Sequence, residues 1–242
     1  MLAFISFSQK TDSTQSTSHF SGTVNITNNG ISIIPTFTLG KPAAIFNFSA
    51  GSKKLSFDPE LKFSLSGKPW GFVFWLRCKL ASTNKWNISV SAHPAFTFHT
   101  ETVSENGTSK DIFVARRYVA AELSPNYSLS KNTSIGMYCL YGHGLQNEGP
   151  QNTYFFTVNS NFSAININSR YYMKFTPQFY YLKIDKEDGF YFTSALTLAK
   201  KNFPLSVSSI INQKINSNIS GSKNFVWNAS LVYTFNKQYV KP

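Results

Sequence analysis

The chain has 242 residues, of which only 14% are charged and 16% are aromatic, and its formal net charge is +12. An aromatic content this high excludes an intrinsically disordered chain. A soluble helical bundle is also excluded, because its exposed faces need Glu, Lys and Arg in quantity. No uncharged apolar run reaches the roughly 18 residues of a transmembrane helix. An all-β protein with unusual surfaces remains.

The N-terminal residues 1–7 form a short apolar run that is followed by Ser8 and Gln9. The run is too short to span a bilayer and has no basic segment before it. It resembles the end of a secretory signal, and cleavage before Gln9 would suit signal peptides of Gram-negative Bacteroidetes; a disordered terminus is the alternative. We expect residues 1–18 to be a signal-peptide remnant with a flexible lead-in, and residues 19–242 to form one domain.

From residue 31 onward, apolar and polar side chains alternate with a period of two, which is the signature of β-strands. Leu55 and Phe57, for example, alternate with Ser56 and Asp58. The alternation predicts twelve strands, at 31–39, 43–50, 53–66, 70–80, 86–98, 111–129, 133–143, 152–163, 170–183, 188–199, 203–214 and 223–236.

The connections between these strands alternate in length, as in a closed up-and-down barrel with one long-loop rim. The longer loops are predicted at 99–110, 144–151, 184–188 and 215–222. Residues 19–28 also have strand character and end at the turn signal of residues 28–30. Because parity leaves room for only two strands before residue 51, we interpret 19–28 as an extra segment or an extension of the first strand.

The same alternation could build a soluble β-sandwich, but three features favour a membrane barrel. The polar phase carries mainly Ser, Thr, Asn, Gly and Ala, as expected of a wet lumen. Aromatic residues gather near strand ends, which is typical of interfacial girdles: Trp70, Trp86, Tyr171, Phe190, Phe203, Phe225, Tyr233 and Phe235. Residues 229–235 are similar to the terminal strand that outer-membrane assembly machinery recognises, although residues 236–242 trail beyond it.

Over residues 20–236 the chain therefore resembles bacterial outer-membrane β-barrels. The resemblance implies an all-β, up-and-down antiparallel transmembrane β-barrel of about twelve strands, located in the bacterial outer membrane. It also implies contact with outer-membrane lipid and lipopolysaccharide, handling by the barrel-assembly machinery, and a monomer.

Five prolines fall inside predicted strands, all in the outward phase: Pro35, Pro59, Pro94, Pro125 and Pro177. Proline cannot donate to a β-ladder and usually marks an edge or a bulge. A closed barrel has no edge, so we expect bulges or kinks at these positions.

The charged side chains separate by position. The inward phase carries seven basic residues, Lys54, Lys62, Arg77, Lys79, Arg116, Arg170 and Lys174, against three acidic residues, Asp58, Glu60 and Glu122. Such a net basic lumen would favour anionic solutes, or its charges could pair and plug the interior. Acidic residues gather at the long-loop rim and basic residues at the short-turn rim, and no single exposed basic patch indicates nucleic acid.

Two classes of function fit this pattern: a porin-like channel for small, in particular anionic, solutes, and a non-conducting structural surface barrel. An enzyme that acts on outer-membrane lipid and a soluble β-sandwich or lipocalin-like binder are the alternatives. Ser91 and His93 share one face but point to the lumen, so we expect no enzyme activity. We expect no cofactor and no metal site, and we interpret Cys78 and Cys139 as buried or lipid-facing thiols.

Overall fold

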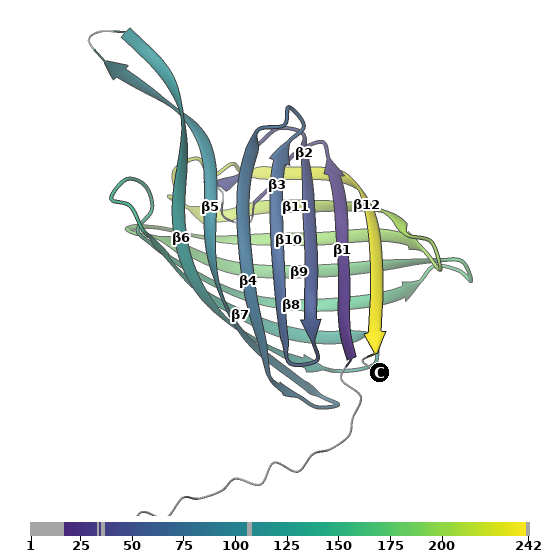
Figure 1. The fold of residues 1–242 in the computed structure, drawn as a ribbon. Coiled ribbons are helices and arrows are strands. Elements are labelled where there is room, and N and C mark those ends of the chain that lie inside the picture. The colour runs from purple at the N-terminus through teal and green to yellow at the C-terminus, as the bar shows by residue number, and fades with distance from the viewer. Residues whose placement is uncertain (1–16, 33, 35–36, 106–107, 241–242) are drawn as a thin grey trace, which may run out of the picture.

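The computed structural model describes residues 17–32, 34, 37–105 and 108–240, which form one closed antiparallel barrel (Figure 1). Its strands are β1 (Thr17–Thr27), β2 (Ala43–Ser52), β3 (Leu55–Ser64), β4 (Pro69–Ser82), β5 (Trp86–Glu105), β6 (Thr108–Ser128), β7 (Thr133–Gly144), β8 (Asn152–Asn166), β9 (Tyr171–Ile184), β10 (Glu187–Lys200), β11 (Leu205–Ser217) and β12 (Phe225–Val240). Each strand pairs with its sequence neighbours, and β1 closes the ring against β12. The predicted up-and-down barrel of twelve strands is confirmed.

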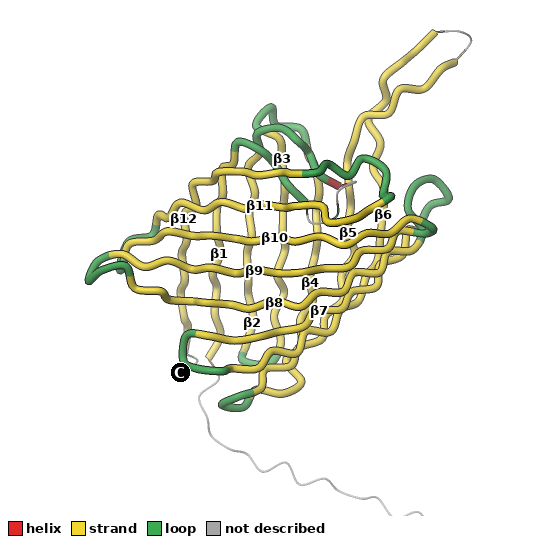
Figure 2. The backbone as a smooth tube through the Cα atoms, turned by 180° about the vertical axis from the view of Figure 1, so that it is seen from behind, coloured by secondary structure: helices red, strands yellow, loops and turns green. Residues whose placement is uncertain are grey.

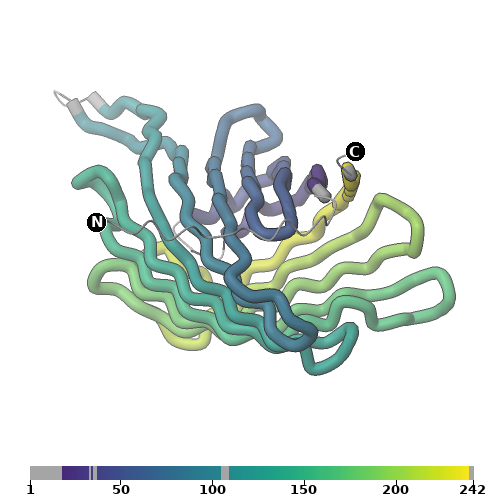
Figure 3. The backbone as a smooth tube through the Cα atoms, turned by 60° about the horizontal axis from the view of Figure 1, so that its bottom comes forward, coloured from purple at the N-terminus to yellow at the C-terminus, as the bar shows by residue number. Residues whose placement is uncertain are grey.

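The chain closes on itself where β1 lies beside β12, as Figure 3 shows from the lower end of the barrel. We call the rim where β1 begins and β12 ends the inner rim; its other connections are short turns. The opposite, outer rim carries the loops 28–42, 145–151 and 218–224. Short turns are typical of the periplasmic rim of bacterial barrels. Among the described residues, no helix is long and apolar enough to cross a membrane.

The identity of the first strand corrects our sequence prediction. Residues 17–27 form a full barrel strand that pairs with both β2 and β12, whereas the described residues of 31–39 form part of a loop. The strand count was right because one segment replaced the other. Apolar alternation in 31–39 comes from a loop that packs inside the barrel mouth, where Ile34 and Phe37 contact interior side chains.

We predicted bulges or kinks at the prolines, and at the four described prolines the prediction of bulges was wrong. Pro59, Pro94, Pro125 and Pro177 are each paired in unshifted register, and the register shifts lie elsewhere, for instance between Lys79 and Ala81. On one side of each proline, the ladder instead omits the proline and the residue before it. The missing donor is therefore accommodated by a local gap in hydrogen bonding, without an inserted residue. Pro35 lies outside the described residues.

Strands β5 and β6 are much longer than a membrane crossing requires, and their outer parts protrude as a two-stranded ribbon (Figure 1). Pairing of β5 with β4 ends at Thr97, while pairing of β5 with β6 continues to Glu105 and Thr108. Most of the predicted loop 99–110 is thus strand. The prediction missed it because this polar segment has no apolar phase and therefore shows no alternation.

The outer surface of the barrel is apolar, and the tube view of Figure 2 shows that strands, with no layer over them, make up the wall. Leu76, Phe179, Val207 and Trp227 are among its exposed side chains. Most of the predicted girdle aromatics are exposed on this face, which suits a barrel embedded in lipid. Trp70 was wrongly assigned to the girdle, because its indole is buried inside the barrel and donates from Nε1 to the carbonyl of Phe37 at 2.8 Å.

Candidate functional site in the barrel lumen

We call the inner wall formed by β3–β6 the charged sector. Arg77 lies at its centre. Arg77 Nε is 2.9 Å from Asp58 Oδ2, and its Nη1 donates to Glu122 Oε1. The guanidinium also lies over the ring of Trp75, with Cζ 4.3 Å from the ring centroid. The Glu122 side chain is only 1% exposed, whereas the Arg77 side chain is 35% exposed. One cation thus bridges two carboxylates from β3 and β6.

Hydroxyl and imidazole groups extend this network to β1. Ser49 Oγ donates to Asp58 Oδ1 at 2.6 Å, and Ser56 Oγ donates to Asp58 Oδ2 at 3.1 Å. His19 Nε2 lies 2.9 Å from Ser49 Oγ. The hydrogen-bonded interior therefore runs without a break from β1 to β6.

The remaining basic residues of the predicted lumen lie in several environments. Lys62 pairs with Glu60 and lies over the ring of Trp70, 5.2 Å from its centroid. Lys174 of β9 is exposed within the lumen phase, 6.0 Å from the ring of Tyr172. Three further basic residues lie at the inner rim: Lys54 in the β2–β3 turn, Arg170 in the β8–β9 turn and Lys79 near the end of β4.

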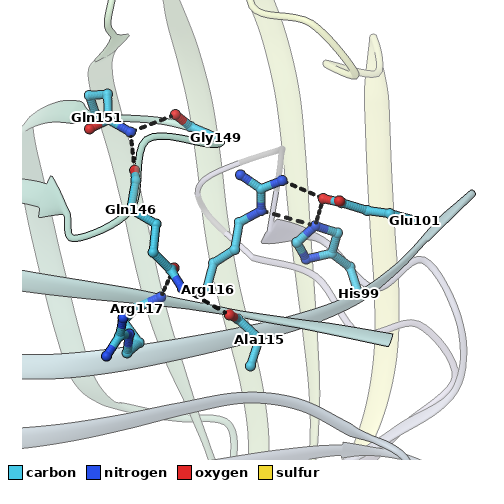
Figure 4. A network of polar contacts seen from close by, with 8 residues as sticks. All are labelled: His99, Glu101, Ala115, Arg116, Arg117, Gln146, Gly149 and Gln151. Carbon is cyan, nitrogen blue, oxygen red and sulfur yellow. Dashed lines mark hydrogen bonds and ion pairs between the residues drawn. The ribbon is translucent and has the colours of Figure 1, made fainter. Parts of the chain in front are cut away.

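Arg116 lies at the outer mouth of the lumen, where Figure 4 shows its contacts. Its Nη2 pairs with Glu101, and His99 Nε2 lies 2.6 Å from the same carboxylate. Hydrogen bonds from Arg116, and then from His99, hold the pKa of Glu101 below its ordinary value. Gly149 of the β7–β8 loop lies close against the guanidinium.

The β7–β8 loop is fastened to the base of the ribbon, as Figure 4 also shows. Gln146 Oε1 accepts a hydrogen bond from the backbone N–H of Arg117 at 2.9 Å. Gln151 Nε2 donates to the carbonyl of Gly149 at 3.1 Å. Hydrogen bonds between glutamine side chains and the backbone therefore hold the loop on this side of the mouth.

Ser91 and His93 contact different groups in the structure. Ser91 Oγ donates to Glu122, while the His93 ring lies 3.8 Å from the ring centroid of Trp75. The described residues also hold no cluster of three or more His, Cys, Asp or Glu side chains placed for a metal ion.

An apolar cluster, which we call the packed sector, lies inside the outer-rim half of β8–β10. It consists of Phe155, Tyr180, Leu182, Ile184, Tyr191 and Ile219. Tyr180 stacks on Tyr191, with ring centroids 4.8 Å apart, and on the other side lies 5.1 Å from Phe155. Ile219 comes from the β11–β12 loop, so that loop folds into the lumen.

The β1–β2 loop closes over the same end of the lumen. Ile34 packs against the packed sector, and the Phe37 ring lies 5.3 Å from the ring of Tyr118 on β6. Trp70 of β4 donates a hydrogen bond to the carbonyl of Phe37. The loop therefore contacts β4, β6 and β8–β10 and narrows the outer mouth.

A third stretch of wall, on β11, β12, β1 and β2, carries uncharged polar side chains. Asn228 Oδ1 accepts from the backbone N–H of Ile210 at 2.8 Å, and Asn212 Oδ1 accepts from Tyr180 at 2.9 Å. Thr23 Oγ1 accepts from Asn47 Nδ2 at 3.1 Å. This wall therefore offers mainly amides and hydroxyls to the lumen.

The sequence prediction missed the aromatic contributors to the lumen. Trp75 shares the inward phase with Arg77, which was the available signal, since an aromatic residue in a polar phase points to interior contact. Phe37 and Ile219 lie in loops whose return into the barrel depends on distant strands. No periodicity could have revealed them.

No protein-family model and no curated protein matches the chain. Among solved structures, an outer membrane channel from Pseudomonas putida F1 is similar at a TM-score of 0.50 and 8% identity, over 91% of this chain and 96% of that one. The NanC porin (TM-score 0.48, 12% identity) is covered completely by 92% of this chain. LpxR from Salmonella typhimurium (TM-score 0.48, 10% identity) is covered completely by 89% of it.

This chain has the fold of bacterial outer-membrane β-barrels. Its apolar outer face agrees with that fold, and the protein is a barrel of the bacterial outer membrane.

Proposed function

We propose that the barrel is a passive channel for small solutes, with a preference for anions, and that it does not catalyse a reaction. The observation that carries this proposal is the exposure of paired charges in the charged sector. In the lumen, the side chains of Lys62 and Glu60 remain 20% and 29% exposed, although they pair with each other. Paired charges that keep this exposure inside a closed wall indicate water around them, and a hydrated polar lumen supports passage of solutes.

The anion preference rests on where the lumen charges are neutralised. Lys62, Arg77 and Arg116 each contact a carboxylate. Among the described side chains, no ion pair is recorded for Lys79 or Lys174. Lys79 and Lys174 therefore place positive charge without a paired carboxylate on the inner-rim side of the lumen, where it would raise the local concentration of anions.

Ion selectivity in planar bilayers tests this proposal. We expect the refolded wild-type barrel to conduct with a modest anion preference, and Lys174→Glu to shift the reversal potential toward cation preference. The double variant Glu60→Gln/Lys62→Gln removes one charge of each sign and is the matched control, with selectivity expected to stay unchanged. An equal reversal potential in the wild type and in Lys174→Glu would contradict the anion preference.

The packed outer mouth favours the second candidate, a non-conducting structural barrel. Contacts of the β1–β2 loop with Trp70 and Tyr118 narrow the opening that solutes must use. Absence of conductance in the wild type and in a Trp70→Ala variant, both shown to be folded by heat-dependent gel mobility, would decide for the structural barrel.

A further inference from the structure

A hollow of about 380 Å³ lies at the inner rim, and three lysines line it. The lining residues are Lys53, Lys54, Lys79, Leu80 and Ser82. Lys53 and Lys54 form the turn between β2 and β3, while the other residues lie at the end of β4. Among the residues that the structure describes, no carboxylate lines the hollow.

The lysines are brought together by the pairing of the strands. The backbone N–H of Lys79 donates to the carbonyl of Lys54 at 2.8 Å, one step beyond the pair Leu55–Cys78. Like charges in such opposed positions destabilise a sheet. The register shift between Lys79 and Ala81 then re-aims the end of β4 beside the hollow.

The two faces of the barrel wall meet in this hollow. Lys79 follows Trp75 and Arg77 in the inward phase, whereas Leu80 is 61% exposed on the outward, lipid-facing phase. Leu55 beside it is exposed as well. A ligand in the hollow can therefore arrive from the lumen or from the inner leaflet of the membrane.

We propose that this lysine hollow binds a phosphate group, supplied either by a lipid headgroup or by a soluble phosphate ester. An ammonium group is a compact donor of charge-assisted hydrogen bonds to phosphate, and three of them around one space relieve their mutual repulsion when an anion enters. Conduction through the barrel is not required for this binding.

The first experiment compares three folded forms of the full chain in uncharged maltoside micelles at fixed ionic strength. These are the wild type, the hollow variant Lys53→Gln/Lys54→Gln/Lys79→Gln, and the rim control Lys85→Gln/Lys200→Gln/Lys201→Gln, which removes equal charge from the same rim. Calorimetric titration with glycerol 3-phosphate measures the soluble source. Native mass spectrometry of retained phosphatidylglycerol measures the lipid source.

We expect the hollow variant to lose about tenfold or more in affinity for at least one probe, while the rim control binds as the wild type does. Loss confined to the glycerol phosphate arm assigns the site to soluble esters, and loss confined to the lipid arm assigns it to headgroups. Equal binding by wild type and hollow variant in both arms would overturn the proposal, as would an equal loss in the rim control.

A single variant keeps the test independent of the triple change. Because Lys54 and Lys79 repel each other, Lys79→Gln should melt at a higher temperature than wild type in phosphate-free buffer. Added glycerol phosphate or phosphatidylglycerol should raise the melting temperature of the wild type and leave that of Lys79→Gln unmoved. Equal ligand-induced shifts in both proteins would argue against a phosphate site.

Discussion

The charged sector and the packed sector line different walls of one lumen and are stabilised by different interactions. Leu182 and Tyr191 in the packed sector are fully buried, and two loops cover them. Arg77 in the charged sector holds two carboxylates yet keeps much of its side chain in contact with water. Close packing buries the side chains of one wall, whereas the ion pairs of the other stay partly exposed.

This difference would allow one barrel to be both firm and, as we propose, permeable. The packed sector holds the outer loops through the apolar contacts of Ile34 and Ile219. Hydrogen bonds add to this, from Trp70 to the Phe37 carbonyl in one loop and from Ser220 to the Glu187 carboxylate in the other. The charged sector leaves a hydrated surface beside it. A lumen need not be uniformly open or uniformly plugged, and each wall can be tested separately.

The largest expected effect is in the packed sector. Leu182→Ala should lower the free energy of unfolding by about 2–5 kcal/mol, because the change removes buried methyl groups and leaves a cavity. Leu198→Ala on β10 is the matched variant, since Leu198 faces lipid and acyl chains can fill the space. Denaturant unfolding from vesicles measures both. Equal losses would mean that the packed sector is no tighter than the lipid-facing surface.

Within the charged sector, Arg77→Gln should cost about 3 kcal/mol, at the lower end of the range for breaking a buried pair. The substitution leaves Glu122 buried without its cationic partner, while the hydrogen bond from Ser91 stays. Lys62→Gln should cost at most about 1 kcal/mol, because Lys62 and Glu60 are both partly exposed. The same unfolding measurement compares the two variants. Similar losses of unfolding free energy in the two variants would show that the burial of Glu122 does not strengthen its pairing with Arg77.

Much of the fold could be predicted because a barrel wall repeats one rule. Each strand separates lipid-facing from lumen-facing side chains, so alternation located eleven of the twelve strands. The rule failed at 31–39, where Ile34 and Phe37 are apolar because they pack inside the mouth. Period two alone cannot distinguish a lipid-facing strand from a loop with an apolar interior face.

The lumen contacts were less predictable, because they depend on which strands lie side by side. The inward phase indicated Asp58, Arg77 and Glu122, but only the register brings these three side chains together across β3–β6. Trp70 was misinterpreted as an interfacial residue, since a tryptophan at a strand end looks the same on either face. Its inward direction follows a register shift in β3–β4 next to Phe63.

Removal of one hydrogen-bond donor, the indole N–H of Trp70, should weaken the anchoring of the β1–β2 loop. Trp70→Phe keeps an aromatic ring and removes the donor to the Phe37 carbonyl, with an expected cost of about 0.5–1.5 kcal/mol. If this loop narrows the mouth, the same variant should increase the single-channel conductance. Trp86→Phe, at the exposed inner rim, is the control and should change neither quantity. Unchanged conductance together with lowered stability would separate loop anchoring from gating.

The smallest expected effect concerns the ribbon at the outer mouth and depends on pH. Hydrogen bonds from Arg116 and His99 lower the pKa of Glu101, so the ionised carboxylate is favoured in the folded state. A lowered pKa means that this contact is complete above the ordinary carboxyl pKa and is lost only as pH falls through the lower folded value.

Hydrogen exchange of residues 98–105 and 108–114, corrected for the intrinsic effect of pH, measures this contact. Protection should stay constant between about pH 7 and pH 5 and should decline only at more acidic pH. Glu101→Gln should reduce protection at neutral pH and remove the acidic step, whereas Glu148→Gln, in the neighbouring loop, should do neither. A decline already near pH 5 would mean that Arg116 does not hold the carboxylate. The ribbon would then be ordered by its strand pairing alone, and the charged contacts that matter would be those inside the barrel.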